Sequence, residues 1–108
     1  EQGAFTLEEA VHMLTEQPAR AWGFEDRGLL KEGYAADVNI FDADRIAPLM
    51  PEVKHDLPAG ARRLVQKATG ISATIVNGVV LMREGEHTGA YPGRLLRGPL
   101  AAGSRAAA

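Results

Sequence analysis

The run ISATIVNGVVLMR, residues 71–83, decides the fold of this 108-residue chain. Two stretches rich in β-branched residues flank the dipeptide Asn77-Gly78. Because both central residues of a type I′ turn need positive φ, Asn-Gly is typical of the two-residue turn of a tight hairpin. The sequence therefore predicts two antiparallel strands, over residues 71–76 and 79–83, joined by Asn77-Gly78.

Further strands are expected on both sides of this hairpin. The run ADVNIFD, residues 36–42, alternates in polarity and predicts a strand with Val38 and Ile40 on one face. Shorter strands are predicted at residues 29–30, between two turns that contain glycine, and over residues 64–67. These runs indicate that most of the chain after its first quarter is β structure.

The N-terminal part is expected to be helical. Thr6 and Glu9 form the pattern of a capping box, in which each side chain satisfies a free backbone N–H of the other residue. Pro18 is expected to end this helix near residue 17 and to begin a second short helix, which Gly23 terminates. One apolar stripe recurs at helical spacing: Leu7, Ala10, Val11 and Leu14.

The remaining segments read as connections. Residues 43–60 hold three prolines and predict a long irregular connection, and residues 85–97 predict a loop. We therefore expect a mainly β domain with an N-terminal helix, an α+β fold. The expected division is two helices over residues 1–24, β structure over residues 25–97 and a flexible tail over residues 98–108.

Length and composition exclude several classes of protein. A complete (β/α)₈ barrel needs about 250 residues, more than twice this length. Without cysteine the chain cannot form a disulfide scaffold, a thiol nucleophile or a thiolate metal site. No run approaches the roughly 18 apolar residues of a membrane span, so we expect no membrane partner and a cytoplasmic location. The first residue is Glu1 rather than Met, and we expect that sequence upstream of it has been removed.

Charge is unevenly spread along the chain. Residues 1–60 hold 12 acidic and 5 basic side chains, whereas residues 61–108 hold 2 and 7. This asymmetry predicts that the two parts attract each other within one fold. A nucleic-acid site would need basic residues interleaved with aromatic ones, and Tyr91 is the single aromatic residue of the basic part. We expect no nucleic-acid partner.

The three histidines do not form a metal-binding motif. His12, His55 and His87 lie far apart in the sequence, and neither His-x-His nor His-Glu-x-x-His occurs. His12 is expected to be solvated on its helix, and His87 lies in a loop between glycines. His55 and Asp56 are adjacent and could act as ligands or as an acid–base pair, although neighbours in extended chain point apart. A surface loop is the simpler interpretation of that pair.

Nucleophilic catalysis has no support in the sequence either. Ser72 lies inside a predicted strand without the Gly-x-Ser-x-Gly elbow, and Ser104 lies in the tail. No glycine-rich phosphate loop of the Gly-x-x-x-x-Gly-Lys type occurs. The residues alone show no catalytic, metal-binding or substrate-binding constellation and do not reveal a function, and paired catalytic carboxylates from distant parts of the fold stay open.

Three motifs in one order resemble the C-terminal end of the amidohydrolase superfamily. They are TLEEAV followed by QPARA and Gly23, then DRG followed by GYAADVNIFD up to residue 42, and finally IVNG at residues 75–78. In that superfamily the last barrel helix leads into a β-sandwich with a Gly-x-x-Ala-Asp-x-x-x-Phe-Asp strand and a closing Val-Asn-Gly hairpin. The resemblance implies that this chain is the C-terminal part of such a composite sandwich, preceded by the last barrel helix.

Two further motifs resemble one branch of the superfamily. HDLPAGARRL at residues 55–64, followed by Gly70-Ile71, and GEHTGAYPGRLLR at residues 85–97 are similar to the N-acyl-D-amino-acid deacylases, or D-aminoacylases. The resemblance extends over residues 5–97. It implies a parent enzyme that uses zinc to remove an acyl group from an N-acyl-D-amino acid.

The zinc ligands and the catalytic aspartate of this family precede the helix that begins here at Thr6, so none of them maps onto this chain. The resemblance thus implies a non-catalytic segment that holds no cofactor itself, while zinc is expected in the missing barrel. Its expected partners are that barrel and the N-terminal strands of the same parent. Pairing with a second copy through open sheet edges is left open. Residues 50–63 are expected to approach the rim of the active site or a subunit interface.

Two other functions stay open at this point. An autonomous β binding module would show a defined pocket or a closed, well-packed sheet. A small enzyme built on His55 and Asp56 would bring His55, His87 and a carboxylate together. Exposed apolar residues on the first helix would instead favour a fragment of a larger enzyme.

Overall fold

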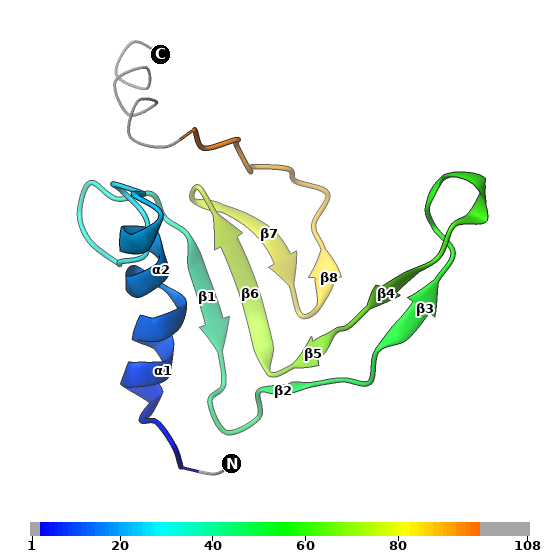
Figure 1. The fold of residues 1–108 in the computed structure, drawn as a ribbon, viewed down its shortest axis with the longest axis horizontal. Coiled ribbons are helices and arrows are strands. Elements are labelled where there is room, and N and C mark those ends of the chain that lie inside the picture. The colour runs from blue at the N-terminus through cyan, green and yellow to red at the C-terminus, as the bar shows by residue number, and fades with distance from the viewer. Residues whose placement is uncertain (1–2, 98–108) are drawn as a thin grey trace. The chain divides into compact units, whose positions relative to one another are not determined.

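The computed structural model describes residues 3–97 and shows two N-terminal helices followed by antiparallel sheets (Figure 1). This is the α+β arrangement expected from the sequence. The helices and strands are α1 Leu7–Leu14, α2 Glu16–Ala21, β1 Val38–Phe41, β2 Ala47–Pro48, β3 Glu52–Lys54, β4 Arg63–Val65, β5 Ala68–Thr69, β6 Ile71–Val76, β7 Val79–Arg83 and β8 Glu86–His87, with a 3₁₀ turn at Pro58–Gly60.

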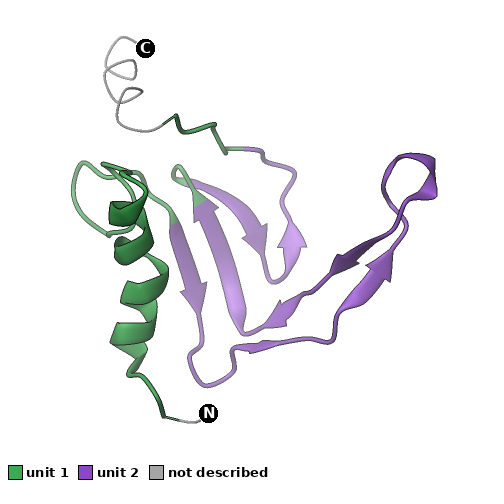
Figure 2. Cartoon of the chain, in the orientation of Figure 1, with its two compact units in different colours: residues 1–37, 76–78, 92–108 green, residues 38–75, 79–91 purple. Residues whose placement is uncertain are grey.

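The described residues divide into two compact units (Figure 2). The first, here the helical unit, holds residues 3–37, 76–78 and 92–97. The second, here the sheet unit, holds residues 38–75 and 79–91. Each unit has its own set of hydrogen bonds.

Helix α1 begins at the predicted capping box. The Thr6 backbone N–H donates to Glu9 Oε2 at 2.8 Å, and the Glu9 N–H donates to Thr6 Oγ1 at 3.1 Å. The helix ends three residues earlier than expected, because the Thr15 hydroxyl bonds back to the Val11 carbonyl and Thr15 leaves the helical conformation. Helix α2 then begins at Glu16, and Pro18 lies in its first turn, where no N–H is needed.

The capping box makes one prediction about pH. Hydrogen bonds from the backbone and hydroxyl of Thr6 lower the pKa of Glu9 below its ordinary value of 4.5. A carboxyl with a lowered folded-state pKa stabilises the fold above about pH 4.5, and this stabilisation is lost as the pH falls through the folded-state pKa. We expect helical circular dichroism to fall in that acidic range. Thr6→Ala should cost about 1 kcal/mol and flatten this pH dependence, whereas Thr88→Ala, in the other unit, should leave it unchanged.

The central sheet of the sheet unit has the strand order β1-β6-β7-β8. The β6–β7 hairpin is confirmed, and Asn77 and Gly78 have φ values of 49° and 78°, as the predicted turn requires. Strand β1 pairs antiparallel with β6, but the register shifts between Ile40 and Phe41. This bulge breaks the expected alternation, so Ile40 is exposed while Phe41 is half-buried.

Three expectations about the connections were wrong. Residues 29–30 form no strand. The expected irregular connection over residues 43–60 contains β2 and β3, which pair with β5 and β4. The loop expected over residues 85–97 contains β8, whereas the strand predicted over residues 64–67 is present in part, as β4. Short strands of this kind depend on partners distant in the sequence, which local patterns do not reveal.

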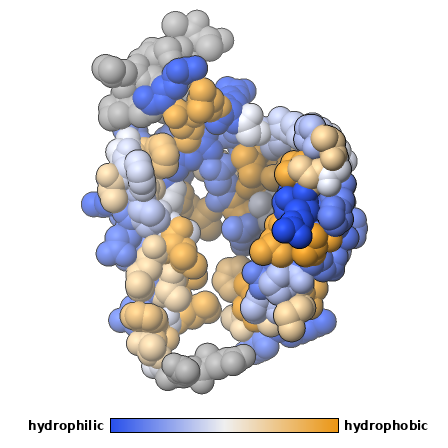
Figure 3. Space-filling model, turned by 45° about the vertical axis from the view of Figure 1, so that its right-hand side comes forward, coloured by the Kyte–Doolittle hydropathy of each residue, from blue (hydrophilic) through white to orange (hydrophobic). Residues whose placement is uncertain are grey.

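Few side chains are buried in either unit. Ala19 is the only buried apolar residue among residues 3–97, at 6% exposure. Large apolar side chains are exposed on α1, on β3 and β4, and in the loops, and Figure 3 shows hydrophobic residues spread over the visible surface. Across residues 3–97, the helices are too short or too polar to cross a membrane. The predicted tail, residues 98–108, lies outside the described residues.

Candidate functional site

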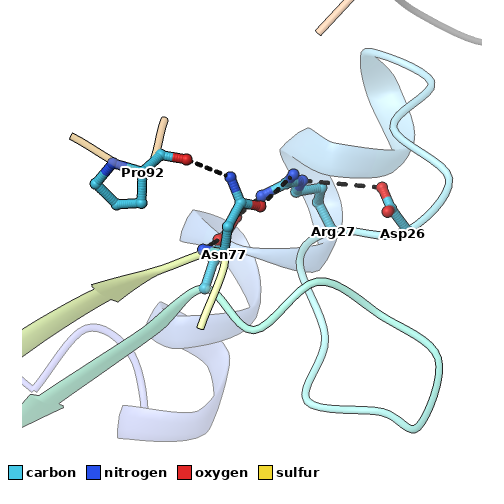
Figure 4. A network of polar contacts seen from close by, with 5 residues as sticks. Asp26, Arg27, Asn77 and Pro92 are labelled. Atoms are coloured by element: carbon cyan, nitrogen blue, oxygen red, sulfur yellow. Dashed lines mark hydrogen bonds and ion pairs between the residues drawn. The ribbon is translucent and has the colours of Figure 1, made fainter. Parts of the chain in front are cut away.

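Four segments of the helical unit meet in one polar network, which we call the Arg27 network. It comprises Asp26 and Arg27 from the loop after α2, Asp37 from the residue before β1, Asn77 from the hairpin turn, and the carbonyl of Pro92 (Figure 4). Two of the three motifs that resemble the superfamily contribute side chains to it, and the deacylase-like motif at residues 85–97 contributes the Pro92 carbonyl. The network is therefore the best candidate for a site that those motifs maintain.

The Arg27 guanidinium lies at the centre of the network, and its side chain is only 14% exposed. Nη1 donates to Asp37 Oδ2, and Nη2 donates to Asn77 Oδ1 at 2.7 Å. Nε has no hydrogen bond of its own and lies 3.8 Å from Asp26 Oδ1, an ion-pair distance. The planar fork of the guanidinium thus directs its two terminal nitrogens at the Asp37 carboxylate and the Asn77 side-chain oxygen.

Asn77 links the network to the hairpin and to the chain after it. Its backbone N–H donates to Asp37 Oδ1 at 2.8 Å, and its Nδ2 donates to the Pro92 carbonyl at 2.8 Å. The Gly78 N–H donates to the Ala36 carbonyl at 2.9 Å. Each of these bonds joins one chain segment to another. The arrangement therefore suits a structural role, holding these segments together, rather than a catalytic one.

The sequence did not predict this network. Asp37 accepts from the backbone N–H of Asn77, which lies 40 residues further along the chain. The central role of Arg27 was missed. The available signal was a single arginine within a tight turn, ten residues before an aspartate that opens a strand.

His55 and Asp56 do not form the acid–base pair considered from the sequence. Asp56 instead accepts two hydrogen bonds from the Arg63 guanidinium, each 2.7 Å long. These bonds hold the pKa of Asp56 below its ordinary range. The His55 ring lies 3.3 Å from the Gly60 carbonyl through Nδ1. Both side chains shape the loop between β3 and β4.

The other two histidines also have structural partners. His12 lies on the exposed side of α1, as expected, with Nε2 3.2 Å from Glu16 Oε2. His87 accepts a hydrogen bond from the Gly89 N–H through Nδ1 at 2.9 Å, and its ring centre lies 4.9 Å from that of Tyr91. Neither contact was predicted from the sequence.

Zinc, the metal that the family resemblance implies, does not fit the residues present. Among residues 3–97 no group of three or more histidine, aspartate or glutamate side chains lies close enough together to hold a metal ion. His55, His87 and a carboxylate therefore do not converge, and the small-enzyme interpretation loses its basis.

Comparison with known proteins confirms the resemblance. Residues 1–82 match the model of the amidohydrolase family. An N-acyl-D-aspartate deacylase and a D-aminoacylase, both of Alcaligenes xylosoxydans, are 36% and 34% identical over 89% and 87% of this chain. A dihydroorotase of Lactobacillus acidophilus is 34% identical over 75% of it.

The chain spans less than a fifth of the length of these relatives, at 18%, 18% and 19%. No solved structure matches it at comparable significance. The family match covers more than two thirds of the chain and includes Asp26, Arg27, Asp37 and Asn77 of the Arg27 network. The chain belongs to the amidohydrolase family, as a segment similar to the D-aminoacylases.

Proposed function

We propose that this chain is the non-catalytic C-terminal β domain of a metal-dependent hydrolase that deacylates N-acyl-D-amino acids. The proposal draws on its similarity to three deacylases, which are 34–38% identical to it. Each of them is more than five times longer than the matched segment, as expected if the reacting groups lie elsewhere. The catalytic metal would be held by residues outside this chain.

The apolar stripe of α1 is the observation that carries the proposal. Leu7, Val11 and Leu14 are exposed, Leu14 at 80%. A surface helix normally buries such a stripe against the domain to which it belongs. An uncovered stripe of this kind marks a contact surface. In our proposal the stripe packs against the catalytic barrel of the parent, and residues 25–97 complete a composite β-sandwich with strands from its N-terminal part.

The alternative of an autonomous binding module has less support. Such a module would need a closed, well-packed sheet. The central sheet described here is open, with β1 and β8 at its edges, and the other two sheets have two strands each. Burial is also slight in both units. Open edges and little burial are typical of a segment that is completed by other parts of a larger protein.

The proposal is tested on the natural polypeptide that contains this segment. An antibody against residues 1–97 should detect a protein large enough to hold a barrel of about 250 residues. The purified protein should deacylate N-acetyl-D-amino acids, and dihydroorotate serves as the second substrate because dihydroorotases are among the relatives. His12→Ala, His55→Ala and His87→Ala should each keep kcat/KM within about threefold of wild type.

Two results would contradict this proposal. A native band at the 11.5 kDa of the chain itself would show a free-standing protein. A loss of kcat/KM of a hundredfold or more in a single histidine variant, with the fold intact by circular dichroism, would place catalysis in this segment. Activity on dihydroorotate alone would replace the substrate class and keep the non-catalytic role.

A further inference from the structure

Strands β3 and β4 form a separate two-stranded ribbon, which we call the arm together with its loop, residues 55–62 (Figure 1). All arm residues from Glu52 to Leu64 are exposed. Each strand has one neighbour in its sheet, so each has one edge without a partner strand among the described residues. A lone hairpin is marginally stable in water, and a free edge can pair with a further strand.

The loop of the arm is nevertheless held in one conformation. Asp56 and Arg63 bridge its base with two hydrogen bonds, and the Leu57 N–H bonds to the Ala61 carbonyl. Ala59 has a positive φ of 60°, a conformation that costs free energy in a residue other than glycine. A rigid ribbon loses little entropy on binding, so the arm is preorganised for a contact.

The two faces of the arm differ in chemistry. Val53 lies directly opposite Leu64 in the register, and the two side chains form an exposed apolar pair on one face. Glu52, Lys54 and Arg63 lie on the other face, since side chains alternate along a strand. Val53 is 55% exposed and Leu64 is 74% exposed.

The two edges differ in charge. Strand β4 begins at Arg63 and contains no acidic residue, so a second copy of the same edge would offer its cation no opposite charge. On strand β3, Glu52 and Lys54 lie one residue before and one residue after Val53, and within one chain they form an ion pair with Lys54 Nζ 2.9 Å from Glu52 Oε2. If two β3 strands pair antiparallel about a two-fold axis at Val53, Glu52 of each copy lies opposite Lys54 of the other.

Pairing about Val53 is confined to the three residues of β3, Glu52–Lys54. Pro51 has no N–H and ends the new ladder on its side, which limits the pairing to residues 52–54.

We propose that the outer edge of β3 pairs with β3 of a second copy of this chain, in an antiparallel arrangement centred on Val53. The product is a four-stranded sheet in the order β4-β3-β3-β4. Its apolar face carries a continuous row formed by Val53 and Leu64 of both copies. This interface is independent of the catalytic assignment, because it concerns association alone.

Charge reversal on the full 108-residue chain tests this register. Glu52→Lys or Lys54→Glu alone places like charges opposite each other at two positions, and we expect the dimer dissociation constant in sedimentation equilibrium to rise roughly 10- to 30-fold. An equimolar mixture of the two variants should associate within about threefold of wild type, since every pair is again opposite in charge. The doubly reversed chain should behave in the same way. Arg62→Glu, in the loop just before β4, is the matched control and should change the constant less than twofold.

Recovery in the mixture also shows that the single variants are folded. Several outcomes would overturn the proposal: a wild-type chain that stays monomeric at millimolar concentration, equal association of all variants, or a mixture no tighter than its components. Equal association would point to contacts through the exposed stripe of α1 instead. None of these results changes the expected deacylase activity of the parent, so the two proposals fail separately.

Discussion

Replacing Gly28 with alanine is expected to lower the free energy of unfolding by about 3 kcal/mol, through overpacking and backbone strain together. Gly28 has a φ of +91°, and a Cβ at this position would lie 2.7 Å from both the Ala19 Cβ and the Thr15 carbonyl oxygen. Thr15 precedes α2 and Ala19 lies within it. The clash could be relieved only if the loop that contains Gly28 moved away from these residues, and that movement would break the contact between them. Urea denaturation followed by circular dichroism measures the effect.

Gly33→Ala is the matched control for this prediction. Gly33 has a similar φ of +85°, but no atom lies within 4 Å of the position a Cβ would take. Its substitution therefore adds backbone strain without a steric clash, and we expect a loss of about 1 kcal/mol. Equal losses in the two variants would show that the approach of Gly28 to α2 contributes nothing to stability.

Asp37→Ala is expected to cost about 2–3 kcal/mol, the second-largest effect in the chain. The substitution removes the acceptor of the Asn77 backbone N–H and the carboxylate that faces the Arg27 guanidinium. Without this carboxylate the largely buried Arg27 guanidinium keeps only Asp26, at 3.8 Å, as a negatively charged neighbour. Amide hydrogen exchange at Asn77 should accelerate together with the loss of global stability.

Two further variants separate the contributions of charge and hydrogen bonding. Asp37→Asn keeps an oxygen acceptor and removes the charge, so it should fall between wild type and Asp37→Ala. Asp44→Ala removes an exposed aspartate from a turn and should change stability by less than about 0.5 kcal/mol. If Asp37→Ala behaved like Asp44→Ala, the Arg27 network would not stabilise the fold.

Local signals predicted the parts of the fold that depend on neighbours in the sequence. The capping box is set by Thr6 and Glu9, three positions apart, and the hairpin by the adjacent pair Asn77-Gly78, and both are present. The arm was not predicted, because Glu52–Lys54 is exposed and short and becomes a strand only through its pairing with Arg63–Val65. Residues 29–30 show the opposite error, since a β-like pair formed no strand in the absence of a partner.

The candidate site was predicted less well than the fold. Without a catalytic motif, the adjacent residues His55 and Asp56 were the candidate acid–base pair. In the structure His55 contacts the Gly60 carbonyl and Asp56 binds Arg63, so the two do not act together. The Arg27 network was not predicted because its residues come from segments up to 66 positions apart. Nothing in the local pattern around Arg27 names Asn77 as its partner.

The bond between Arg27 and Asn77 joins residues 50 positions apart, which has a consequence for the order of folding. The capped helix and the hairpin depend on local contacts, and such elements form in microseconds or less. The bond can close only after the intervening chain has been brought together, at a cost in entropy that local contacts do not bear. We therefore expect the helix and hairpin to fold early and the Arg27 network to close late. Substitutions in the network should then accelerate unfolding more than they slow folding.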